Sequence, residues 1–138
     1  MRYLIQGVFF QSLVGLDLQT LETGKAVVLT QLVGSMFCGV LESNRKNFAS
    51  EGFTFDVYGK AGLDEIRIAD NTLSFVKQYS HRPDTIEYSY AKLNDGTWVG
   101  GWAMKLQGEE LARGETRCII TPVTERFFEP TVKVVFEA

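Results

Sequence analysis

The stretch from Glu65 to Leu106 most limits what this chain can fold into, because it reads as consecutive strands separated by tight turns. Apolar and polar residues alternate in each strand, so each strand has one largely aromatic face. We expect these faces to point inward. The residues on the predicted inner faces are Leu73, Phe75, Lys77, Tyr79, Ile86, Tyr88, Tyr90, Trp98, Gly100, Trp102 and Met104.

Turn-forming residues separate these strands at Asp70-Asn71, at 81–84 and at 94–96. Asn and Asp tolerate a left-handed backbone, glycine adopts it freely, and Pro83 presets a turn while being excluded from a central ladder. Upstream, glycines at 59–62 are expected to bend a strand around Phe53 into one at 65–68. Downstream, segment 107–114 is predicted to be a loop. Strands are then expected at Thr116–Pro122 and Thr131–Phe136.

The N-terminal third is harder to interpret. Segment 2–11 is apolar on both faces, which favours a strand covered on both sides or one at a seam. Segment 13–23 fits either a short strand or a helical turn. A hairpin turn is expected at Gly24. Segment 25–42 has helical spacing too, but its β-branched run favours strands, and a glycine costs a helix interior about 1 kcal/mol.

We expect a turn at Gly34-Ser35 to divide this segment into strands at 26–33 and 36–41. The polar stretch 42–51 is predicted to be a long loop, and loops of this length in compact domains are often functional.

Composition predicts a single all-β domain over residues 1–138, with 13 glycines, 3 prolines and 12% aromatic residues. Short strands at hairpin spacing suit a sandwich or an antiparallel up-and-down β-barrel of about eight to ten strands, and closure of a barrel leaves no exposed edge. We therefore predict the barrel.

The formal charge of −3 argues against nucleic-acid binding, which needs a concentrated basic face. No apolar run is long enough for a bilayer-crossing helix and no signal peptide is recognised, so we expect a cytoplasmic protein without a membrane partner. Cys38 and Cys118 lie far apart without companion ligands, which favours reduced core thiols over a disulfide or a metal site.

Catalytic patterns are absent from the sequence. His81, the single histidine, lies in a turn and is interpreted as a solvated loop residue rather than a general acid or base. Acidic residues are scattered, and no glycine-rich phosphate loop is present. An enzyme is therefore the less favoured interpretation, and we expect no cofactor and no metal.

Lys77 is the informative exception, because strict alternation places it on an inner face. A buried lysine must pair with an acid, contact water in a cavity or meet an anionic ligand. The alternative is that it lies near a barrel mouth, or that a bulge turns it outward.

The aromatic residues on the same faces could form the walls of a pocket or simply fill the core. Gly100 could open a hollow between the tryptophans or allow close packing. The predicted ligand-binding residues are Phe75, Lys77, Tyr79, Tyr88, Tyr90, Trp98 and Trp102.

The segments 73–79, Ile86-Glu87-Tyr88 and Gly100-Gly101-Trp102 resemble the hairpin series of small calycin-like barrels, the group of lipocalins, avidins and fatty-acid-binding proteins. The resemblance implies an antiparallel barrel that binds a small apolar ligand inside. The Gly-x-Trp of lipocalins lies on the first strand, and Arg117 is not followed by the Arg-x-Tyr pattern of fatty-acid-binding proteins. No family site is therefore carried over.

The favoured function is non-covalent binding of a small, partly apolar or anionic ligand, with Lys77 orienting the anionic group. The alternative is a solid-core barrel that serves as a protein-interaction or oligomerisation module. In that case a second copy of the chain is a candidate partner, through the 42–51 loop or an apolar stripe such as Val132, Val134 and Phe136.

Overall fold

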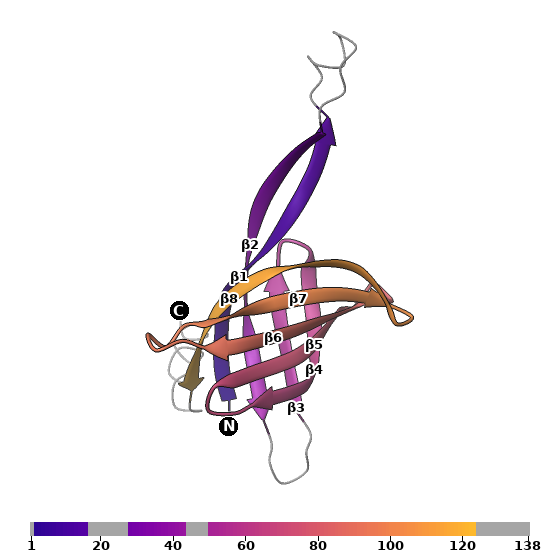
Figure 1. Cartoon of the computed structure of the whole chain (residues 1–138). Coiled ribbons are helices and arrows are strands. Elements are labelled where there is room, and N and C mark those ends of the chain that lie inside the picture. The colour runs from indigo at the N-terminus through magenta and orange to yellow at the C-terminus, as the bar shows by residue number, and fades with distance from the viewer. Residues whose placement is uncertain (1, 17–27, 44–49, 124–138) are drawn as a thin grey trace, which may run out of the picture.

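A computed structural model of the chain describes residues 2–16, 28–43 and 50–123. In this part, antiparallel strands pair in sequence order and close into one barrel, because β8 pairs with β1 (Figure 1). This confirms the predicted all-β up-and-down barrel, with eight strands. They are β1 (Arg2–Leu16), β2 (Val28–Ser43), β3 (Ser50–Asp56), β4 (Gly59–Ile68), β5 (Thr72–Tyr79), β6 (Thr85–Lys92), β7 (Trp98–Leu106) and β8 (Glu109–Val123).

The three predicted turns of the central meander are confirmed. They join β4 to β5, β5 to β6 and β6 to β7. In the last of these, Gly96 has a φ of 88°, a left-handed conformation that costs a glycine little.

Three predicted boundaries are wrong. No turn occurs at Gly34-Ser35, because β2 runs through both residues and Gly34 instead makes room for Phe10, whose ring would lie 3.2 Å from an added Cβ. The chain turns at 57–58 rather than at 59–62, so Gly62 lies within β4. The pairing of β4 with β5 is irregular only between Asp64 and Arg67. The predicted 107–114 loop is reduced to a turn at 107–108, where both residues have positive φ.

Some expectations fall partly or wholly outside the described residues. The undecided segment 13–23 is strand as far as Leu16, and its remainder is not described. The turn at Gly24, most of the 42–51 loop, the strand at 131–136 and the proposed stripe in that strand also lie outside the described residues.

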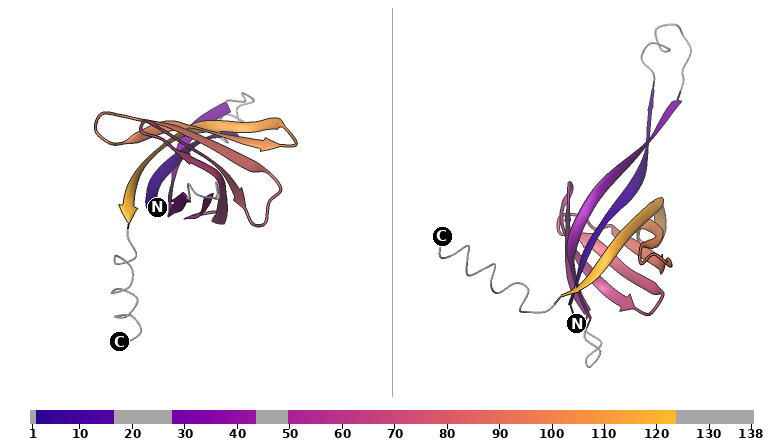
Figure 2. Two further views of the ribbon diagram at one scale, coloured as in Figure 1. Left: turned by 90° about the horizontal axis from the view of Figure 1, so that it is seen from below. Right: turned by 90° about the vertical axis from the view of Figure 1, so that its left-hand side faces the viewer.

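β1 and β2 extend beyond the barrel as a two-stranded arm, which we define as residues 10–16 and 28–37 (Figure 2). Pairing of β1 with β8 stops at Phe9, and pairing of β2 with β3 starts at Cys38. Within the described residues, the arm strands therefore pair only with each other.

The aromatic faces of the meander point inward, as predicted, and their side chains form much of the buried core. Phe75 stacks on Tyr88 at 4.9 Å between ring centroids, and Tyr88 stacks on Tyr90 at 6.2 Å. The Tyr90 hydroxyl hydrogen-bonds Thr116, which in turn donates to the Val8 carbonyl. Other buried members of this core are Ile5, Leu41, Leu63, Ile66, Leu73, Trp98 and Cys118.

Gly100 neither opens a hollow nor admits another side chain. A Cβ at this position would lie 1.7 Å from the Ser89 carbonyl oxygen, so the glycine is needed for the close approach of β7 to β6.

We expect Gly100→Ala to lower the free energy of unfolding by about 1–3 kcal/mol, because the strand backbones must separate. Gly62→Ala is the matched control, since nothing lies within 4 Å of its added Cβ, and it should change stability by less than about 0.5 kcal/mol. Urea unfolding measures both. Equal effects of the two substitutions would contradict the close approach.

Candidate ligand-binding site

Lys77 points into the barrel and is almost completely buried, with 1% of its side chain exposed. Its ammonium group donates a hydrogen bond of 2.7 Å to the Asp56 carboxylate, which is itself fully buried. Of the outcomes expected for an inward lysine, pairing with an acid is the one observed, and the outward alternative is wrong.

Asp56 ends β3 and uses both carboxylate oxygens. Oδ1 accepts from the Tyr58 backbone N–H at 2.8 Å, which closes the β3–β4 turn, whereas Oδ2 also accepts from the Tyr79 hydroxyl at 2.5 Å. One carboxylate thus joins β3, the turn and two positions of β5. Charge-assisted hydrogen bonds of this kind are stronger than neutral ones.

Aromatic rings surround the remaining faces of the ammonium group. Ring centroids lie 4.7–5.8 Å from Nζ, within the range of cation–π attraction. Burial lowers the pKa of Lys77, and the hydrogen bond and charge of Asp56 oppose that shift. The rings belong to Phe9, Phe37, Tyr79 and Tyr88.

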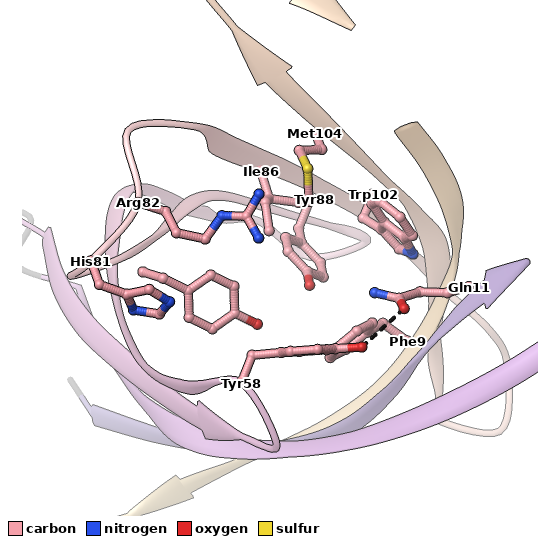
Figure 3. A pocket seen from close by; sticks show the side chains of 10 residues that line it. Phe9, Gln11, Tyr58, His81, Arg82, Ile86, Tyr88, Trp102 and Met104 are labelled. Atoms are coloured by element: carbon pink, nitrogen blue, oxygen red, sulfur yellow. Dashed lines mark hydrogen bonds between the residues drawn. The ribbon is translucent and has the colours of Figure 1, made fainter. Parts of the chain in front are cut away.

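A pocket of about 310 Å³ lies at the arm end of the barrel, next to this ion pair (Figure 3). Three of the rings around Lys77 also line the pocket, so they separate the ion pair from the open mouth. β1 and the turns after β3 and β5 supply the other walls together with β6 and β7. The lining residues are Phe9, Gln11, Tyr58, Tyr79, His81, Arg82, Ile86, Tyr88, Trp102 and Met104.

Some polar groups of the pocket are held by neighbours, whereas the Tyr88 hydroxyl is not. The Tyr58 hydroxyl donates to Gln11 Oε1 at 3.1 Å, and the Trp102 indole N–H donates to the Phe10 carbonyl at 3.0 Å, where β1 has left β8. Within the described residues, the Tyr88 hydroxyl has no hydrogen-bond partner, and it faces the pocket (Figure 3). Burial raises the pKa of Tyr88, and the charge of Asp56 raises it further, so the hydroxyl stays a neutral donor.

Basic side chains lie at the rim of the pocket. Arg82 Nε is 2.8 Å from Asp84 Oδ1, and no other side-chain hydrogen bond of its guanidinium group is formed within the described residues, so donors remain for a ligand. His81 is exposed, as predicted, but its ring also lines the pocket, 6.0 Å from that of Tyr79. No acidic side chain lines this pocket.

The seven residues predicted to bind a ligand fall into two groups. Tyr79, Tyr88 and Trp102 line the pocket, and Lys77 lies behind its rings. The others lie in the filled part of the barrel, away from the pocket walls; they are Phe75, Tyr90 and Trp98. A ligand-binding role for any of the seven stays a prediction.

Sequence reasoning missed Asp56, Gln11 and Arg82. The alternation of β3 gave no signal for Asp56, because an aromatic inner face would point Asp56 outward, whereas in the structure Thr54 is buried and Phe55 is 47% exposed. Arg82 was recognised only as a turn residue, since nothing local indicates that its turn lies beside Tyr58 and Gln11.

The cysteine prediction is half right. Both thiols are free, and Cys118 is buried, but Cys38 is exposed on the outer surface and is not a core thiol. Burial raises the pKa of Cys118 to about 12, against a smaller opposing effect of its hydrogen bond with Tyr90.

Comparison with known proteins identifies no relative: no protein-family model and no curated protein sequence matches the chain. Among the described residues, no group of His, Cys, Asp and Glu is arranged to hold a metal ion. The same part of the chain contains no helix long and apolar enough to cross a membrane.

We expect Asp56→Asn to destabilise the barrel by about 3–5 kcal/mol, because it leaves the Lys77 charge buried without a counter-ion. Adding Lys77→Met to this variant should restore most of the loss, since an apolar side chain of similar length suits the ring cage. A urea double-mutant cycle measures the coupling. Losses that simply add would show that the two groups do not depend on each other.

Alkaline unfolding should be driven by tyrosines. Burial raises the pKa of Tyr79, Tyr88 and Tyr90 above the ordinary value of about 10. Their neutral forms therefore stabilise the fold fully below that value, and this contribution is lost as the pH rises beyond it. After a jump to high pH, phenolate absorbance of these three should appear only with loss of the native circular dichroism. Complete tyrosine ionisation in a barrel that is still native would contradict their burial.

Proposed function

We propose that this protein binds, without covalent chemistry, a small, flat and partly apolar molecule that carries an anionic group. The observation that carries the proposal is the mouth pocket, which combines apolar walls, a basic rim and the Tyr88 hydroxyl, which faces the pocket and has no hydrogen-bond partner among the described residues. Its volume of about 310 Å³ lies at the small end of ligand pockets, which begin near 300 Å³.

The apolar part of the ligand would lie against Phe9 and Trp102, which contact each other edge to face, with ring planes at 81° and centroids 6.5 Å apart. Ile86 and Met104 would cover its edge, and the Tyr88 hydroxyl would donate to a polar atom of the ligand. Aromatic walls with few polar groups are typical of sites that orient a small molecule.

The anionic group would bind at the rim, to Arg82, rather than to Lys77. Each cation is paired with a carboxylate, Lys77 with Asp56 and Arg82 with Asp84. Lys77 is 1% exposed, whereas Arg82 is 48% exposed and has guanidinium donors that Asp84 does not use. Lys77 would then act indirectly, by holding the rings of Phe9, Tyr79 and Tyr88 that form the inner wall.

The likeness to calycin-like barrels belongs to the same proposal. It is supported by the closure of eight antiparallel strands in sequence order and by a pocket at one mouth. No residue role is taken from that likeness.

Titration with naphthoate and with its neutral analogue naphthamide tests the proposal through tryptophan fluorescence. Both should quench the native protein, and naphthoate should bind more tightly. The signal should persist in Trp98→Phe and be lost in Trp102→Phe, because Trp102 lines the pocket.

Arg82→Gln should weaken naphthoate binding about tenfold, since a hydrogen bond to a charged group contributes about 1.5 kcal/mol, and should leave naphthamide binding nearly unchanged. Arg67→Gln is the control, because this arginine is exposed and lies outside the pocket. The proposal would be contradicted if neither compound quenched the fluorescence, or if Arg82→Gln weakened the binding of naphthoate and of naphthamide equally.

A further inference from the structure

The outer surface of the barrel exposes large apolar side chains where β1 and β2 leave it. Met36 is 81% exposed and Leu32 is 67% exposed. Directly paired residues lie on the same face of a sheet, so Met36 shares its face with Val8, while Phe9 and Phe37 occupy the inner face.

The same face continues onto the neighbouring strands. Cys38 lies opposite Phe55 on β3, which is 47% exposed, and Ile119 on β8 is 48% exposed beside β1. We name this surface the outer apolar face. It comprises Val8, Phe10, Leu32, Met36, Cys38, Val40, Phe53, Phe55 and Ile119.

Apart from Arg2 and Glu42, the two strands at the centre of the outer apolar face carry no charge. The sequence contains no charged residue at 3–16 or at 26–41. Charges of both signs surround the face: Arg2 pairs with Glu42 at 3.5 Å, Lys60 lies over the Phe53 and Phe55 rings, and Arg117 follows the exposed Glu115 along β8.

The arm also leaves backbone groups unpaired. Beyond Phe9 on β1 and before Cys38 on β2, each strand has one edge without a hydrogen-bonded neighbour among the described residues. A two-stranded ribbon is only marginally stable alone, and exposed edges readily accept another strand. A partner that covers the outer apolar face and pairs with an arm edge would bury the exposed apolar side chains and supply hydrogen bonds to the unpaired backbone groups.

We propose that the outer apolar face, with the arm, is the contact surface for a second copy of this chain. The uncharged stretches of β1 and β2 meet their own copy without like-charge repulsion, as a two-fold interface requires. Arg117, which lies beside Val8 on this face, has the exposed Glu115 two residues away. The mixed rim lets opposite charges of two copies pair. By contrast, the net charge of −3 does not favour an anionic bilayer as the occupant.

Sedimentation equilibrium of the full chain between about 1 and 100 µM tests the proposal, which is independent of ligand binding. We expect a species of twice the chain mass, and we expect Met36→Lys and Leu32→Lys each to raise the dimer dissociation constant at least tenfold. Leu111→Lys is the control, because Leu111 is 52% exposed but lies outside the outer apolar face, and it should leave the constant unchanged.

Labelling of Cys38 with a maleimide gives a second readout, since the other thiol, Cys118, is buried. Labelling should slow as the native chain dimerises, and it should not slow in Met36→Lys. A native chain that is monomeric throughout, or a dimer that Leu111→Lys weakens as much as Met36→Lys does, would overturn the proposal. Flotation of a monomeric chain with phosphatidylcholine–phosphatidylserine vesicles, abolished by Met36→Lys, would likewise overturn it and would identify a bilayer as the occupant.

Discussion

The ion pair between Lys77 and Asp56 is the interaction on which the interior of this barrel depends. A lysine that is 1% exposed is tolerated only because the carboxylate and four aromatic rings replace its water. Replacing such a pair with apolar residues need not cost stability. We therefore infer that the main effect of the pair is to fix the positions of the strands and rings around it. It joins the end of β3 to β5 and holds the rings that separate the filled part of the barrel from the mouth.

This division explains how one barrel can have both a solid core and a pocket at its mouth. Stacking of Phe75, Tyr88 and Tyr90 fills one part, whereas the mouth retains about 310 Å³ because turns and β1 form its walls. Tyr88 belongs to both: its ring stacks in the core and its hydroxyl faces the pocket. A ligand of the proposed kind would therefore contact a side chain that also packs in the core.

The alternation from β5 to β7 was enough to predict the inner faces, because strands have a strict period of two. It placed Lys77 on one of these faces but left open whether the side chain lies at a barrel mouth or is turned outward by a bulge. The same logic failed for β3, where the aromatic Phe53 and Phe55 lie outside and Asp56 lies inside. The partner of Lys77 is 21 residues away, and the site brings Gln11 beside Tyr58, 47 residues on. Such contacts follow from barrel closure and register, which no local pattern encodes. The arm, likewise, follows from where the pairing of β1 and β2 with their neighbours stops.

Methyl NMR of the methionines tests the central claim, ligand entry at the barrel mouth, most directly. Met104 lines the pocket, Met36 lies on the outer apolar face, and the chain has one further methionine, Met1. Saturation with naphthoate should shift the Met104 methyl resonance through ring currents and leave that of Met36 in place. An unchanged Met104 resonance under conditions that saturate tryptophan quenching, or a shift confined to Met36, would contradict a ligand site at the mouth.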